Sequence, residues 1–140
     1  MSLEEKNKEI ARDALRRVWS EGDLAAVDDL YAADFVSHQN PGSVELEDVR
    51  GLGPLRSFVQ EFREAFEGFS DEISLQCAEG HLVATRFISS GRHTGTLWGI
   101  APTGREVSWS GIVIDRVVDG RIAENWVNWD SANLLRQLEA

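Results

Sequence analysis

The spacing of apolar residues changes near residue 69, and this change limits the folds that the chain can adopt. Before it, apolar residues recur every three or four positions, which is the period of an amphipathic helix. After it, they alternate with polar residues, as in a strand with one buried face. Helices that precede a run of strands favour an α+β fold, in which the helices pack on one face of an antiparallel sheet.

The helical half of the chain contains three predicted helices. The first spans residues 3–20, and Asp23 can cap a second, short helix that includes Tyr31. The third begins at Gly53-Pro54, where the missing N–H of proline costs nothing, and its apolar stripe extends to Phe66. Such a stripe is typical of a helix face that is buried in the core.

The second half predicts a four-strand antiparallel meander followed by a short terminal helix. Ile73, Leu75 and Cys77 are expected to share one buried face of the first strand, which makes Cys77 a core thiol. Asp119-Gly120 is a hairpin turn between the last two strands. A short strand or extended segment is also expected before the third helix. The expected strands span residues 35–39, 73–77, 82–88, 107–118 and 122–130.

Length and charge narrow the functional classes. The 140 residues favour a single domain that spans residues 1–140. A formal net charge of -10 repels phosphate backbones and anionic membranes, so we expect no nucleic-acid or membrane partner. No apolar run reaches membrane-spanning length and no secretory signal opens the chain, so we expect a cytoplasmic protein.

The segment that closes the last strand contains the first candidate for chemistry. Strand alternation puts Trp126, Asn128 and Asp130 on one face, with Val127 and Trp129 on the other. A carboxyl beside bulky apolar rings loses hydration, which raises its pKa and suits it to proton transfer near neutral pH. The competing interpretation is that Asp130 only caps the last helix.

Motifs for cofactors and metals are not found. Gly51-Leu52-Gly53 lacks the third glycine of a dinucleotide loop, and the chain has no Walker-type loop. His38, His81 and His93 are too dispersed for a zinc pattern, so we expect neither a metal nor a cofactor. His38 is either a pocket residue or a partly buried histidine with a hydrogen-bond partner. His93 is either a pocket residue or a strand-end histidine that binds backbone groups.

Several segments, taken in order, resemble the SnoaL-like polyketide cyclase (ester cyclase) family. The resemblance covers nearly the whole chain and departs from the family pattern at Glu67-Gly68, where Pro-Asp is usual, and at His81, where an acid is expected. The matching segments are Tyr31 to His38, Phe62 to Phe66, Gly91 to Val107 (GRHTGTLWGIAPTGREV), Ile114 to Arg116, Asp119 to Ile122, Trp126 to Asp130 and Leu134 to Leu138.

The resemblance implies an NTF2-like cone, in which three helices close a strongly bent sheet over an apolar pocket. It further implies that Asp130 is the acid/base of an intramolecular aldol closure without a cofactor, with His93 or His38 as hydrogen-bond donor to the oxyanion. A small apolar carbonyl compound would be the substrate, and an exposed sheet face would favour a homodimer. The expected substrate-binding residues are Phe58, Phe62, Trp98, Trp109, Trp126 and Asn128.

Two other functions compete with the cyclase. Asp115, Arg116 and Asp130 supply the residue types of an epoxide hydrolase, but Asp115 and Arg116 are adjacent in a strand and point to opposite faces. The chain could also be a non-catalytic small-molecule-binding or dimerisation module, because this fold hosts both enzymes and adaptors. The surroundings of Asp130 distinguish an enzyme from an adaptor: a cavity wall in the first, a solvated helix cap in the second.

Overall fold

The computed structural model describes residues 1–139, and its N-terminal half is helical as predicted. Helix α1 (Leu3–Asp13) starts at Ser2, whose hydroxyl accepts a hydrogen bond from the Glu5 N–H at 3.1 Å. The chain continues as a π-helix, η1 (Ala14–Ser20), and then as the short turns η2 (Leu24–Ala26) and α2 (Val27–Leu30). After the strands β1 (Tyr31–Asn40) and β2 (Val49–Arg50), helix α3 (Leu52–Ala65) completes this half.

A six-stranded sheet forms the other layer, in the order β2-β1-β6-β5-β4-β3. The predicted meander is confirmed, since β3, β4, β5 and β6 pair antiparallel in sequence order. The sheet is nevertheless mixed, because β1 lies parallel to β6. The strands are β1 (Tyr31–Asn40), β2 (Val49–Arg50), β3 (Phe66–Glu79), β4 (Leu82–His93), β5 (Glu106–Val118) and β6 (Arg121–Trp129).

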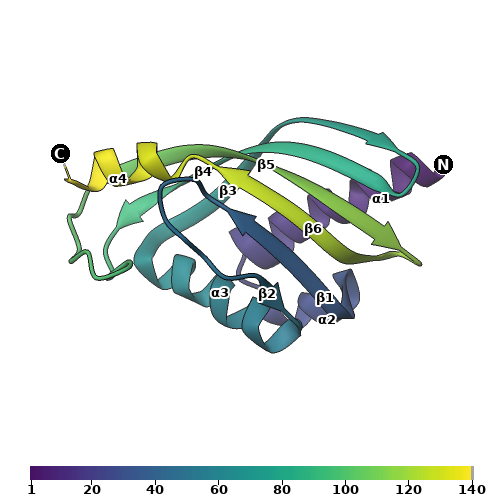
Figure 1. Ribbon diagram of the computed structural model, residues 1–140, viewed down its shortest axis with the longest axis horizontal. Coiled ribbons are helices and arrows are strands. Elements are labelled where there is room, and N and C mark those ends of the chain that lie inside the picture. The colour runs from purple at the N-terminus through teal and green to yellow at the C-terminus, as the bar shows by residue number, and fades with distance from the viewer. Residues whose placement is uncertain (140) are drawn as a thin grey trace.

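Helices α1, α2 and α3 lie on one side of the curved sheet (Figure 1). Buried side chains fill the space between the two layers in two clusters, and Trp19 and Phe58 contact both of them. The terminal helix α4 (Ser131–Glu139) packs against β5. The expected α+β cone is therefore confirmed. Within residues 1–139, no helix is both long enough and apolar enough to cross a membrane.

Three local expectations were wrong. Tyr31 and Phe66 were placed at helix ends, yet each is the first residue of a strand. Cys77 is exposed rather than a core thiol. The cause is a register shift between Ile73 and Leu75, which reverses the alternation of β3 and turns Leu75 and Cys77 outward.

Candidate active site

A cavity of about 80 Å³ lies between the helices and the concave face of the sheet. Its walls are mainly aromatic, with Phe58 and Phe62 from α3, Trp109 from β5 and Trp129 from β6. Phe62 packs edge-on against Trp129, with ring centroids 5.8 Å apart and planes at 81°. Such interlocked rings make a firm apolar wall, which suits a flat apolar ligand.

At one end of the cavity, three polar side chains lie side by side on neighbouring strands. Ser37 of β1 pairs in register with Asn125 of β6, and Asn125 pairs with Asp115 of β5. Asn125 Nδ2 donates to Asp115 Oδ1 at 3.1 Å, and Gln39 Nε2 donates to Ser37 Oγ at 2.8 Å. Asp115 is only 4% exposed. The amide of Asn125 therefore holds a buried carboxyl in a fixed orientation on the cavity wall.

A second carboxyl lines the cavity at a different level of the sheet. Asp71 of β3 lies opposite Ser89 of β4, and the Ser89 hydroxyl donates a hydrogen bond to Asp71 Oδ1. The residue that lies opposite Asp115 on β4 is Val83, six positions before Ser89 in the sequence. The two carboxyls thus lie at different levels of the sheet, although the charges of both raise the pKa of Tyr31.

Burial raises the pKa of both carboxyls to about 7, and in each case the hydrogen bond from Ser89 or Asn125 only partly opposes this effect. No lysine, arginine or histidine among residues 1–139 forms an ion pair with either group. Both protonation states are consequently populated near neutral pH, which is the property that a general acid/base needs.

Tyr31 adds a hydrogen-bond donor to the same cavity. Burial is the main cause of its raised pKa, and the nearby charge of Asp115 raises it further. The phenol therefore keeps its proton at neutral pH. A protonated hydroxyl near Asp115 can stabilise an oxyanion that develops there.

Asp130 lies outside the cavity, which corrects its expected location. The side chain is exposed, and its Oδ1 accepts the N–H of Asn133 at 3.0 Å at the start of α4. Trp126 and Asn128 are exposed on the same outer face. The predicted alternation of β6 is thus correct, but the face that lines the cavity is the other one, with Asn125, Val127 and Trp129. A catalytic role for Asp130 remains a prediction that this location does not support.

The other expected substrate-binding residues divide between the cavity and its surroundings. Phe58, Phe62 and Trp109 line the cavity as expected. Trp98 lies behind the wall instead, where its ring packs 5.9 Å from both Phe62 and Trp129. Trp98 can therefore support the wall, but it does not line the cavity.

Neither predicted histidine lines the cavity. His93 is fully buried, and its Nδ1 accepts the N–H of Thr103 at 3.1 Å. Burial lowers the pKa of His93, mainly because a charged imidazole would lose its hydration there. These contacts match the alternative of a histidine that binds backbone groups.

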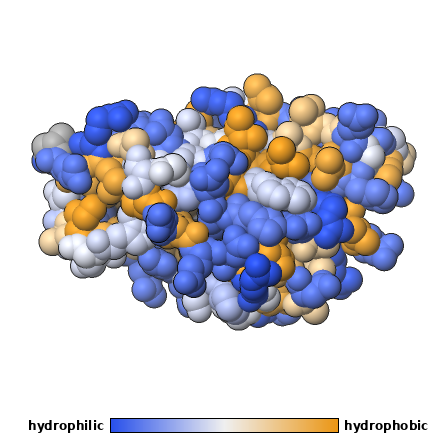
Figure 2. Space-filling model, viewed as in Figure 1, coloured by the Kyte–Doolittle hydropathy of each residue, from blue (hydrophilic) through white to orange (hydrophobic). Residues whose placement is uncertain are grey.

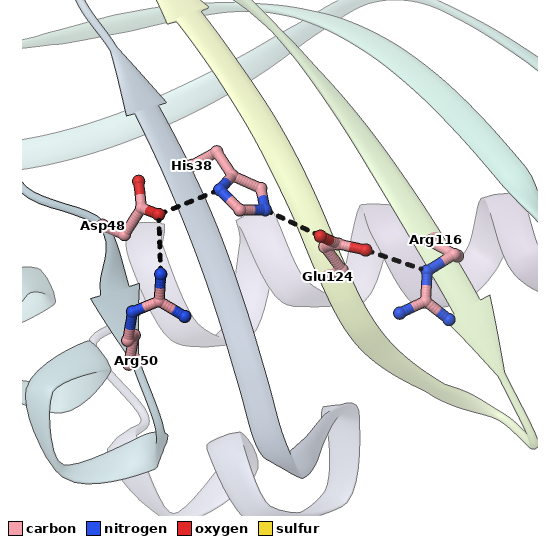
Figure 3. Close-up of polar contacts among 5 residues, drawn as sticks. All are labelled: His38, Asp48, Arg50, Arg116 and Glu124. Carbon is pink, nitrogen blue, oxygen red and sulfur yellow. Dashed lines mark hydrogen bonds and ion pairs between the residues drawn. The ribbon is translucent and has the colours of Figure 1, made fainter.

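His38 lies on the outer face of the sheet, in a chain of charged groups (Figure 3). Its Nε2 contacts Glu124 at 2.7 Å and its Nδ1 contacts Asp48 at 3.1 Å. The hydrogen bond to Glu124 is the main cause of its raised pKa. Glu124 also binds Arg116 at 3.2 Å. Arg116 therefore points away from the cavity, while Asp115 points into it. Strand geometry predicted these opposite directions, which argue against an epoxide hydrolase.

Asp71, Asn125 and Tyr31 were not among the expected site residues, and Asp115 was considered only for epoxide chemistry. A signal for Asp115 existed in the alternation of β5, where it shares a face with Trp109 and Val113. Asp71 lies on the same inward face of β3 as Ile73, but it precedes the expected strand, which began only at residue 73. No group of three or more metal-binding side chains is present within residues 1–139.

The fold is that of an NTF2-like protein, and its cavity has an aromatic wall that carries two carboxyls. The family model of SnoaL-like polyketide cyclases matches residues 9–138. The aklanonic acid methyl ester cyclase DauD of Streptomyces sp. (strain C5) is 32% identical over 131 residues, which cover 90% of this chain and 80% of DauD. DnrD of Streptomyces peucetius, of the same name, is 30% identical over 129 residues, which cover 90% of this chain and 88% of DnrD.

A solved structure supports the fold independently. A putative SnoaL-like polyketide cyclase from Jannaschia sp. CCS1 superposes with a TM-score of 0.89 at 18% identity, covering 100% of this chain and 96% of that one. The chain belongs to the SnoaL-like polyketide cyclase family. The cyclase-type function implied by the resemblance is confirmed at the level of the family.

Proposed function

We propose that the protein catalyses an aldol-type ring closure or isomerisation of a small apolar carbonyl compound, with Asp115 as the acid/base. One observation carries the proposal: Asp115 is a buried carboxyl on the wall of an aromatic cavity, oriented by the Asn125 amide at 3.1 Å. A carboxyl in such surroundings exchanges protons near neutral pH.

In the proposed reaction, the Asp115 carboxylate removes a proton from a carbon next to a carbonyl, and the C–H electrons form an enolate. The Tyr31 hydroxyl stabilises the enolate oxygen by a hydrogen bond. The enolate carbon then forms a bond to a second carbonyl carbon, whose π electrons move to its oxygen. Asp115 returns the proton to that alkoxide, which gives a hydroxyl group and regenerates the carboxylate.

The names of the relatives supply a probe substrate. DauD and DnrD are named aklanonic acid methyl ester cyclases, so we propose aklanonic acid methyl ester as the first compound to test. The decisive comparison is between Asp115→Asn and Asp130→Asn, because both remove one carboxyl and keep the side-chain size. The reaction is run at pH 7, and chromatography measures the amount of product formed.

General acid/base catalysis contributes about 100- to 10,000-fold to a rate. Asp115→Asn should therefore lose at least about 100-fold of the turnover, whereas Asp130→Asn should keep it within about threefold. The opposite pattern would restore Asp130 as the acid/base. Wild-type protein that converts none of the ester in this assay would contradict the proposed substrate.

We also propose that two copies of the chain associate through the outer face of the sheet. Ile112, Ile114 and Trp126 are exposed there, at 48%, 38% and 38%. Figure 2 shows apolar side chains between hydrophilic ones on this side of the molecule. An exposed apolar sheet face favours a two-fold interface. Sedimentation should give a dimer for the wild type and a monomer for Ile114→Lys, and a monomeric wild type would refute the interface.

A further inference from the structure

The mechanism leaves Asp71 without a role. This carboxyl is partly buried and lines the cavity. Within residues 1–139 its side chain forms one hydrogen bond, from Ser89, and no ion pair. A carboxyl in apolar surroundings without a cation makes folding less favourable. Since the fold does not use this group for pairing, a ligand is its natural partner.

The backbone around Asp71 holds the carboxyl in place. Its own N–H donates to Ser20 Oγ at 2.9 Å, which ties β3 to the end of η1. Ser89 is 3% exposed, so the hydroxyl that binds the carboxyl is itself fixed within the wall. Neighbours on the cavity wall include Phe69, Phe87 and Trp109. Asp71 and Ser89 thus form a preorganised polar point in an apolar wall.

The sheet register separates this point from Asp115. Ser89 lies opposite Asp71, Val83 lies opposite Asp115, and six positions of β4 lie between Ser89 and Val83. Six residues of a strand span about 20 Å when extended, and the curvature of the sheet brings the two ends closer. Both carboxyls also raise the pKa of the same Tyr31 hydroxyl, so they face a common part of the cavity that one ligand can occupy.

We propose that Asp71 and Ser89 form a second recognition point, which binds a hydroxyl or carbonyl group at the end of the ligand remote from Asp115. The ligand is thus an apolar ring compound with hydrogen-bonding groups at two separate positions. The proposal rests on the proposed function only for the statement that chemistry takes place at Asp115. In its neutral form Asp71 donates to a carbonyl, and in its ionised form it accepts from a hydroxyl.

The test compares two rigid probes, naphthalene-2,6-diol and 2-naphthol, which differ only in the hydroxyl at the far end. Dissociation constants come from NMR titration of the backbone amides. Wild-type protein should bind the diol about tenfold more tightly than 2-naphthol, as expected for one added hydrogen bond in a cavity. Asp71→Leu keeps the bulk of the side chain and removes the polar group, so it should reduce this gain to about twofold. The remaining factor of about two is statistical, because the symmetric diol can bind in two equivalent orientations.

Glu72→Leu is the matched control, because it removes a neighbouring carboxyl that is exposed outside the cavity. It should keep the full gain. The proposal is overturned if Asp71→Leu keeps the gain as well, or if the wild type does not prefer the diol. A second measurement does not depend on the variant: nuclear Overhauser contacts should join the bound diol to Ser89 in the wild type, and their absence contradicts the proposal.

These binding measurements involve no turnover. An Asp115→Asn variant that retained full activity would remove the proposed function and leave the probe result intact. Conversely, a failed probe test would leave the role of Asp115 standing.

Discussion

Replacing Asp115 by asparagine should stabilise the protein above neutral pH, because the native state then no longer contains a buried, ionising carboxyl. Burial raises the pKa of Asp115 from 3.8 to about 7 in the folded chain. Between these values the unfolded chain releases the proton first, so the free energy of unfolding falls as the pH rises from about 4 to about 7. Below this window the carboxyl is neutral in both states.

A difference of about 3 pKa units corresponds to about 4 kcal/mol at 1.36 kcal/mol per unit. This figure is an upper bound for the gain at pH 8, since the asparagine also changes the hydrogen bond with Asn125. We expect Asp115→Asn to exceed the wild type by about 2–4 kcal/mol at pH 8 and by less than about 1 kcal/mol at pH 4.5.

Urea unfolding, followed by tryptophan fluorescence at both pH values, measures these differences. Asp130→Asn serves as the control, because its carboxyl is exposed at the start of α4. The pH dependence that the other carboxyls give to the free energy of unfolding is the same in both proteins, so it cancels when the variant is compared with the wild type. If the difference between Asp115→Asn and the wild type were the same at pH 4.5 and pH 8, the carboxyl would not ionise as a buried group, and the reasoning would fail.

Two further predictions concern stability away from the cavity. Asp130→Ala should lower the free energy of unfolding by about 1 kcal/mol, because the N–H of Asn133 loses its cap, and thermal unfolding measures this loss. Gly95→Ala should lower it by about 1–3 kcal/mol, since a Cβ there would lie 2.3 Å from the Glu64 carbonyl oxygen. Gly53→Ala is the comparison, because apart from its chain neighbours nothing lies within 4 Å of its Cβ position in α3, and this change should cost less than Gly95→Ala. A neutral Gly95→Ala would contradict the close packing.

Periodicity was sufficient to predict the layers of the fold. Residues 3–20 and 53–65 repeat their apolar positions over several turns, so their helices could be recognised locally. The hairpin at Asp119-Gly120 was predictable for the same reason, since its turn chemistry is local. The parallel pairing of β1 with β6 was not predictable, because it joins segments about 90 residues apart and depends on how the helices pack.

The candidate site depended on which face of each strand turns inward. Alternation correctly separated Trp126 and Asn128 from Val127 and Trp129, but alternation alone does not say which set faces the helices. Because the wrong face of β6 was expected to line the cavity, Asp130 was predicted as the acid/base instead of Asp115, the partner of Asn125 on β5. Asp71 was missed for another reason: it lies on the same face of β3 as Ile73, but the expected strand began only at residue 73. The register shift after Ile73 instead exchanged the faces of Leu75 and Cys77.

A carbon-13 NMR titration of the Asp115 carboxyl in the folded protein tests the proposed acid/base most directly. The resonance is assigned from its absence in Asp115→Asn. Its chemical shift should change with a midpoint near pH 7, because burial raises the pKa of this group to about 7. A carboxyl that stays ionised down to pH 4 would contradict the proposal that the cavity holds an acid/base at this position.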